Sequence, residues 1–142
     1  MRTPRVSAFR IDAPTTPEKA KEHFPSGDSA VILQALSLAS AQNLGFVRMI
    51  AAQTVKARAR GILLARKPEV DLLLRFAGTT QIKEAIRVAG AATGKPFLLV
   101  VIGQAGALKG AGSIGKELPN RPLTKEELLR VERAALLNAQ RS

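Results

Sequence analysis

Cysteine, tryptophan and tyrosine are absent from this 142-residue chain, and histidine occurs once, as His23. Without cysteine the chain can form no disulfide framework, no thiolate nucleophile and no zinc–cysteine cluster. A single histidine excludes metal sites built from several histidines. Asp12, Asp28 and Asp71 are scattered without the spacing of metal ligands. The sequence therefore predicts neither a bound metal nor a cofactor.

Catalytic side chains are also missing as a recognisable set. His23 lies in a short polar segment, and no serine, cysteine or carboxylate constellation can be placed around it. A solvent-exposed bystander is the simpler interpretation of this histidine. We therefore expect no catalytic residues and a function in binding.

No uninterrupted apolar run approaches the roughly 20 residues needed to cross a bilayer. The first residues lead into an alternating pattern with no apolar core of a signal peptide. We therefore expect a soluble, cytoplasmic protein with no membrane partner.

Acidic residues are scarce, which leaves a net charge of +11. Residues 29–68 contain no acidic side chain at all, although several cations fall within them. Such an excess favours a polyanionic partner, although a solvated surface tuned for solubility explains it equally well. With five phenylalanines as its only aromatic residues, the chain is poorly equipped to stack RNA bases. RNA would therefore be held through phosphates, backbone amides and an apolar pocket.

Hydrophobic periodicity and turn residues predict the secondary structure of one domain, residues 1–142. Alternation at Val70, Leu72, Leu74 and Phe76 is typical of a strand, and the continuous apolar run at 95–103 indicates an inner strand. We expect strands at 6–11, 31–33, 70–76 and 95–103, and helices at 17–24, 40–58, 82–89 and 124–140.

Two helix starts are marked by capping residues. Thr16 precedes Pro17 at the first helical position, and Thr124 with Glu127 forms a capping box. In the last helix we expect Leu128, Val131 and Ala135 to form the buried stripe. Leu129, Leu136 and Leu137 fall away from this stripe and need another cover, so they are the predicted partner-binding residues.

A glycine-rich string at residues 110–116 resembles the first part of a phosphate-binding loop that ends in Lys116. Glu117 then stands where a magnesium-binding serine or threonine is required, and Pro119 opposes the helix that should follow. A nucleotide-binding enzyme that uses this loop is one hypothesis, and a basic loop without that role is the alternative.

The turn Gly78-Thr79-Thr80 precedes a predicted helix, whose first amides could bind a phosphate. Lys83 and Arg87 are spaced as i and i+4 and share the face opposite the apolar stripe. An RNA backbone would relieve their repulsion, and screening by Glu84 and solvent is the equally supported alternative.

The run Glu69-Val-Asp-Leu-Leu-Leu-Arg-Phe-Ala-Gly-Thr-Thr-Gln-Ile-Lys-Glu-Ala-Ile86 resembles the signature of the CGI-type subunit of the KEOPS complex, the PRPK-binding protein family. In that family an apolar strand ends in a small residue and glycine, followed by Thr-Gln-Ile or Arg-Gln-Ile and a helix with Ala-Ile. The likeness extends back through residues 57–65. The region 103–122 is richer in glycine than the family pattern.

This resemblance implies an α+β fold, a small mixed and largely antiparallel sheet packed with helices. The order of elements alone would suggest a parallel α/β sheet, but the connections are too uneven for repeated βαβ units. The resemblance further implies a non-catalytic subunit that binds the kinase-like ATPase subunit and captures the CCA end of tRNA. The transferase subunit would then modify an adenosine of the tRNA to threonylcarbamoyl-adenosine. This subunit would be an indirect partner of the chain.

Combining the charge pattern with the resemblance yields a set of predicted RNA-binding residues. They are Lys56, Arg58, Arg60, Arg75, Gly78, Thr79, Thr80, Gln81 and Lys83. A generic basic RNA-binding module unrelated to KEOPS is the alternative, and it would be indifferent to the CCA end of tRNA.

Overall fold

The computed structural model describes residues 4–12, 15–22, 24, 31–104 and 115–141. Its strands are β1 (Arg5–Ile11), β2 (Ile32–Ser37), β3 (Phe97–Gly103) and β4 (Lys116–Glu117). Its helices are α1 (Pro17–Lys21), the 3-10 helix η1 (Leu38–Ser40), α2 (Leu44–Arg60), α3 (Pro68–Ala77), α4 (Ile82–Ala89) and α5 (Lys125–Arg141).

The four strands form one sheet in the order β2-β3-β1-β4, and each described pairing is antiparallel. β3 lies at the centre, with Leu99 opposite Phe9 of β1 and Leu98 opposite Leu36 of β2. All of β3 is buried, which confirms the predicted inner strand. β4 pairs only with Phe9 and Arg10 among the described residues of β1.

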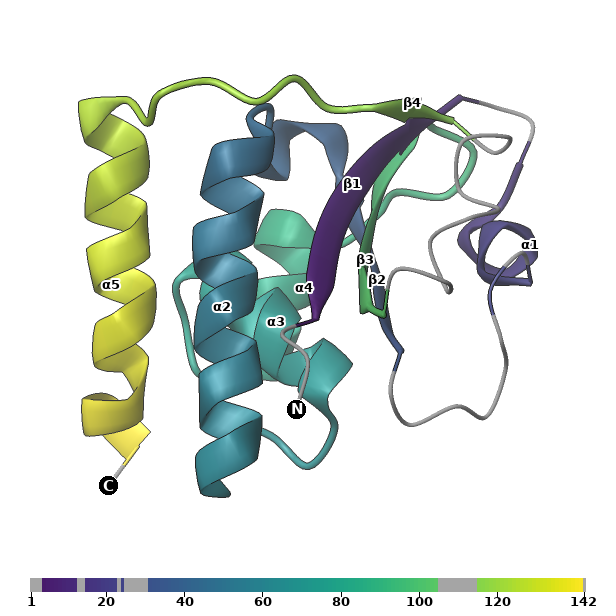
Figure 1. The fold of residues 1–142 in the computed structure, drawn as a ribbon. Coiled ribbons are helices and arrows are strands. Elements are labelled where there is room, and N and C mark those ends of the chain that lie inside the picture. The colour runs from purple at the N-terminus through teal and green to yellow at the C-terminus, as the bar shows by residue number, and fades with distance from the viewer. Residues whose placement is uncertain (1–3, 13–14, 23, 25–30, 105–114, 142) are drawn as a thin grey trace.

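Each face of the sheet has its own hydrophobic core, because successive strand side chains point to opposite faces. α2, α3 and α5 lie on one side of the sheet and α1 lies on the other (Figure 1). Ala8 and Leu98 belong to the larger core beneath α2 and α3. Phe9 and Leu99 belong to the smaller core, which includes Phe24. These two layers of helix around an antiparallel sheet confirm the predicted α+β class.

Capping residues set the ends of α2. The side chain of Asn43 accepts a hydrogen bond from the backbone N–H of Gly45 at 2.9 Å. At the other end Gly61 has a φ of 68°, and its N–H donates to carbonyls of the last turn, as a left-handed glycine does after a helix. The helix therefore begins four residues later than periodicity indicated and ends close to the predicted glycine.

The predicted strand at 70–76 is wrong, because this segment forms helix α3. Pro68 occupies its first turn, Glu69 and Asp71 lie near its positive end, and Gly78 closes it with a φ of 72°. Leu72, Leu73, Leu74 and Phe76 are all buried. A short helix buried on several sides loses its 3.6-residue pattern, so its leucines alternated by coincidence.

Helix α5 begins with the predicted capping box. The N–H of Thr124 donates to Glu127 Oε1 at 2.9 Å, and the N–H of Glu127 donates to Thr124 Oγ1 at 3.1 Å. Gln53 Nε2 donates to the carbonyl of Val131 at 2.9 Å and ties α5 to α2. Within the described residues, no helix is long and apolar enough to span a membrane.

Candidate nucleic-acid interface

Three cations lie along one exposed face of α2. Arg48, Lys56 and Arg60 are spaced by multiples of four residues, with Ala52 between the first two, and side chains four apart share a helix face. All four residues are exposed. α2 therefore presents a positively charged row to solvent.

This row borders a groove of about 750 Å3 between α2 and the beginning of β1, within the size range of small-ligand pockets. We call it the β1–α2 groove. The lining residues are Pro4, Arg5, Val6, Ser7, Arg48, Ala52, Val55, Lys56 and Glu117.

Cations from two different elements converge on the β1–α2 groove. Arg5 comes from β1, whereas Arg48 and Lys56 come from α2. Charges brought together in a concave surface focus the electrostatic field and attract anions. Among the described lining residues three side chains are positive and one, Glu117, is negative, so this part of the wall carries an excess of positive charge.

The remaining lining is largely apolar. Val6, Ala52 and Val55 lie among the cations, and Val6 and Val55 also pack against the main core. Such a mixture suits a ligand with both anionic and flat or apolar parts, as a nucleotide has. None of the described residues that line the groove is aromatic, so these residues offer no ring on which a base could stack.

Glu117 is held at the edge of the β1–α2 groove by β4. Its backbone pairs with Phe9 of β1, and its carboxylate accepts a hydrogen bond from the hydroxyl of Ser7. Ser7 is itself buried. The carboxylate therefore has a defined position beside the cations.

The structure brings together only part of the predicted RNA-binding set. Lys56 lines the groove, and Arg60 continues its row. Arg58, two residues from Lys56, projects from another side of the helix. Sequence reasoning missed Arg5 and Arg48 as site residues. The four-residue spacing along α2 could have identified Arg48, but no sequence signal indicates that β1 lies against this face.

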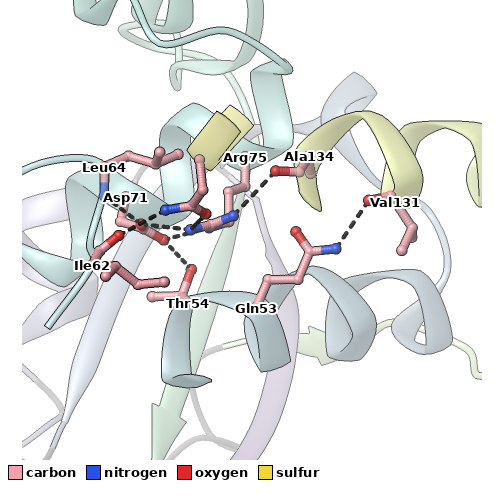
Figure 2. Close-up of polar contacts among 9 residues, drawn as sticks. Gln53, Thr54, Ile62, Leu64, Asp71, Arg75, Val131 and Ala134 are labelled. Atoms are coloured by element: carbon pink, nitrogen blue, oxygen red, sulfur yellow. Dashed lines mark hydrogen bonds and ion pairs between the residues drawn. The ribbon is translucent and has the colours of Figure 1, made fainter. Parts of the chain in front are cut away.

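Arg75 is not accessible to RNA, which corrects its prediction as a contact. It is 2% exposed, and it pairs with Asp71 one turn earlier on α3. Its guanidinium also donates to the carbonyl of Ala134 at 3.1 Å and to Asn138 Oδ1 at 2.8 Å. Figure 2 shows Arg75 between Asp71 and Ala134. A buried cation needs such partners, so its role is structural.

The other members of this buried network are groups from α2 and the following loop. Asp71 Oδ1 accepts from Thr54 Oγ1 at 2.6 Å, and Asp71 Oδ2 accepts from the N–H of Leu64 at 2.9 Å (Figure 2). Both carboxylate oxygens are thus satisfied. The network joins α2, α3 and α5.

The predicted turn at Gly78–Gln81 lies at the end of α3, apart from the lining of the groove. Arg133 of α5 lies against Gly78. Thr79 Oγ1 accepts from the N–H of Gln81 at 3.1 Å, and the side chain of Gln81, at the N-cap of α4, makes no capping hydrogen bond. The turn residues are partly or fully exposed, so they form a second surface, separate from the groove.

Lys83 and Arg87 are both exposed on α4. Arg87 Nε donates to Glu84 Oε2 at 3.0 Å. That hydrogen bond lowers the pKa of Glu84, and the same contact raises the pKa of Arg87. Glu84 therefore offsets the charge of Arg87, as the alternative interpretation expects. Lys83 is the exposed cation of α4 that lies nearest to the turn in the sequence.

The predicted partner-binding leucines divide in the structure. Leu129 and Leu136 are 57% and 61% exposed, whereas Leu137 is fully buried. Leu137 is therefore not a surface residue, which corrects its prediction. The buried face of α5 is formed by Ala134 and Leu137, because the helix lies rotated from the expected stripe at Leu128, Val131 and Ala135. Of that stripe, Leu128 and Ala135 are exposed and Val131 is half-buried.

Most of the glycine-rich string and His23 lie outside the described residues. Lys116 is described, and it is exposed on β4 opposite Arg10. No helix directly follows it: residues 118–124 have no regular secondary structure, and α5 begins at Lys125. Across the described ranges, no group of three or more histidine, cysteine, aspartate or glutamate side chains could hold a metal ion.

Comparisons with known proteins leave the family of this chain open. No family model matches the chain, and no curated protein matches it.

Proposed function

We propose that this chain is a non-catalytic, cytoplasmic RNA-binding subunit and that the β1–α2 groove contacts the RNA. The observation that carries the proposal is the convergence of Arg5, Arg48 and Lys56 on one groove of about 750 Å3. These cations would neutralise RNA phosphates, and release of the counterions condensed on the RNA favours binding. The apolar part of the lining suits a base or a sugar.

The charge of the whole molecule supports the same ligand class. A net charge of +11 steers the chain toward polyanions over distances of about 10 Å at moderate salt. Arg60 continues the positive row along α2 beyond Lys56. An RNA strand that leaves the groove toward the end of α2 therefore meets a further cation.

The specific form of the proposal is the CGI-type subunit of KEOPS, which captures the CCA end of tRNA and binds the kinase-like ATPase subunit. Its support is the resemblance of the run Glu69–Ile86, which the structure distributes over α3, the turn at Gly78 and α4. The α+β class that the resemblance implies agrees with the observed fold. The strand that it implies at 70–76 does not agree, since α3 is helical.

A separate surface is available to the protein partner. Leu129 and Leu136 are seven residues apart on α5, so they project from the same exposed side of the helix. Large apolar side chains grouped on one helix face are typical of a contact with another protein. We assign this face of α5 to the kinase-like subunit.

Binding of tRNA by fluorescence anisotropy tests the proposal. Arg48→Glu and Lys56→Glu should each weaken binding at least tenfold, because each replaces attraction of phosphate by repulsion. Lys19→Glu is the matched control: it makes the same charge change on α1, across the sheet from the groove, and should have a much smaller effect. Equal losses in all three variants would show that net charge, and not the groove, holds the RNA.

Two further measurements address the KEOPS form. Affinity should fall when the CCA end of the tRNA is removed, and the chain should co-purify with the kinase-like subunit. Indifference to the CCA end would favour a generic RNA-binding module. Failure to bind tRNA at moderate salt, together with failure to assemble with the kinase-like subunit, would refute the proposal.

A further inference from the structure

Glu117 is the acidic residue among the described residues that line the β1–α2 groove. A carboxylate at this place repels phosphate, so it opposes the binding that Arg5, Arg48 and Lys56 favour. Binding of anions alone therefore does not explain why a carboxylate lies in this groove.

The position of this carboxylate is well defined. Ser7, which is 4% exposed, donates its hydroxyl hydrogen to Glu117 Oε2. The backbone of Glu117 pairs with Phe9, and the N–H of Leu118 donates to the carbonyl of Ala8 at 2.9 Å. A carboxylate that is anchored by its strand and by a buried hydroxyl is preorganised, as specific recognition requires.

The carboxylate also keeps capacity to bind a ligand. An ionised carboxylate has about four acceptor sites on its two oxygens, and the hydroxyl of Ser7 uses one of them. A ligand that combines phosphates with an O–H or N–H donor would satisfy both the cations and Glu117. Ribonucleotides have this combination, through the 2′-hydroxyl or through the amino group of a base such as cytosine.

Resting on the proposed RNA-binding function, we infer that Glu117 is a specificity-determining residue of the β1–α2 groove, which accepts a hydrogen bond from the 2′-hydroxyl or the base amino group of the bound nucleotide. Arg5, Arg48 and Lys56 then hold the phosphates, and Ser7 orients the carboxylate. Hydrogen bonding to a charged acceptor gives discrimination of about tenfold against a ligand that lacks the donor.

A different role for Glu117 leads to a different result. If Glu117 only balances the charge of the cations, its removal strengthens the binding of every anion alike and changes no preference. If it accepts a hydrogen bond, its removal abolishes a preference that the wild-type protein shows. Selectivity, and not affinity alone, separates the two roles.

The experiment measures dissociation constants for unstructured oligonucleotides of about five nucleotides. Comparing oligocytidylate as RNA and as DNA reports on the 2′-hydroxyl. Comparing oligocytidylate with oligouridylate, whose base has a carbonyl oxygen in place of the amino group, reports on the base amino group. Inorganic tripolyphosphate serves as an anion with no hydrogen-bond donor of either kind. Glu117→Ala is tested beside Glu117→Gln, which keeps the side chain's size, and beside Glu132→Ala. The last variant removes the same charge from α5, outside the groove.

The wild-type protein should prefer the donor-bearing oligonucleotide by about tenfold in at least one comparison. Glu117→Ala should reduce that preference to less than twofold without weakening tripolyphosphate binding, and Glu132→Ala should retain it. RNA binding with no preference in either comparison, or a preference that survives Glu117→Ala, overturns the inference and leaves the proposed function intact. Absence of oligonucleotide binding by the wild-type protein overturns both.

Discussion

Arg75 and Asp71 form a buried ion pair one turn apart on α3, with Arg75 Nε 2.8 Å from Asp71 Oδ1 and both side chains almost completely removed from solvent. A second hydrogen bond joins Nη2 to Oδ2 at 3.1 Å. Because the remaining donors of Arg75 reach Ala134 and Asn138, this one side chain connects α3 to α5. The helix that carries the proposed protein-binding face is therefore positioned from within the core.

Replacement of Arg75 by methionine should destabilise the protein by about 3–5 kcal/mol, because it leaves the charge of Asp71 buried without its partner. Chemical denaturation measures this change. The double variant Asp71→Asn/Arg75→Met should lose less than the sum of the single variants, since the unpaired charge is gone. An Arg75 variant that unfolds at the wild-type denaturant concentration would contradict the structural role.

The salt dependence of RNA binding should report the number of groove cations that contact phosphates. Each phosphate contact with a single strand contributes about 0.7 to the slope of log affinity against log salt concentration. The variant Arg48→Ala/Lys56→Ala should therefore reduce the slope by about 1.4. An unchanged slope together with lower affinity would indicate that these residues act through the structure of the groove and not through phosphates.

Gly78 should not tolerate a side chain. Its φ of 72° is strained for other residues, and an added Cβ would lie 3.0 Å from Arg133 Nε. Gly78→Ala should therefore cost about 1 kcal/mol or more. Thermal unfolding measures the loss, and Gly61→Ala is an informative comparison, since Gly61 also has a positive φ but an added Cβ there meets nothing within 4 Å. A larger loss at Gly78 than at Gly61 would measure the contact with Arg133.

The capping box of α5 should make part of the stability dependent on pH. Burial raises the pKa of Glu127, but hydrogen bonds from Thr124 and Asn43 outweigh it and hold the pKa below its ordinary value of 4.5. Because the pKa of Glu127 is lowered in the folded state, its contribution to the free energy of unfolding is complete above pH 4.5. This contribution is lost as the pH falls through the folded-state pKa.

Glu127→Ala should therefore cost about 1 kcal/mol near neutral pH, as capping substitutions do, and progressively less below pH 4.5. Unfolding curves across this pH range measure the difference. Glu127→Gln keeps a residue that can complete the box and should cost less than alanine at neutral pH. A cost of Glu127→Ala that stays constant down to pH 2 would contradict the role of the ionised form.

The exposed leucines of α5 should matter for the protein partner and not for stability. Leu136→Glu, alone or with Leu129→Glu, should abolish co-purification with the kinase-like subunit, because it places a charge in an apolar contact. The free energy of unfolding should change by less than about 0.5 kcal/mol, as expected for surface positions. Val88→Glu, which changes an exposed apolar residue on a different helix, α4, is the matched control and should retain the partner.

Local signals in the sequence determined several elements correctly. Thr16 with Pro17 and Thr124 with Glu127 mark helix starts that the structure reproduces, because capping involves residues only three apart. The continuous apolar run ending at Gly103 identified the central strand, since a strand covered on both faces has no polar side. Such features depend on near neighbours in the chain.

Tertiary structure alone decided the state of α3 and the composition of the groove. Residues 70–76 alternate as a strand does, but burial on several sides favours a helix whose ends are set by Pro68 and Gly78. From the sequence, Arg75 is predicted to be a surface cation, but in the structure it is hydrogen-bonded to Asp71, Ala134 and Asn138. The groove joins Arg5 to Arg48 across more than 40 residues of sequence, and a contact between such distant segments leaves no local pattern from which it could be predicted.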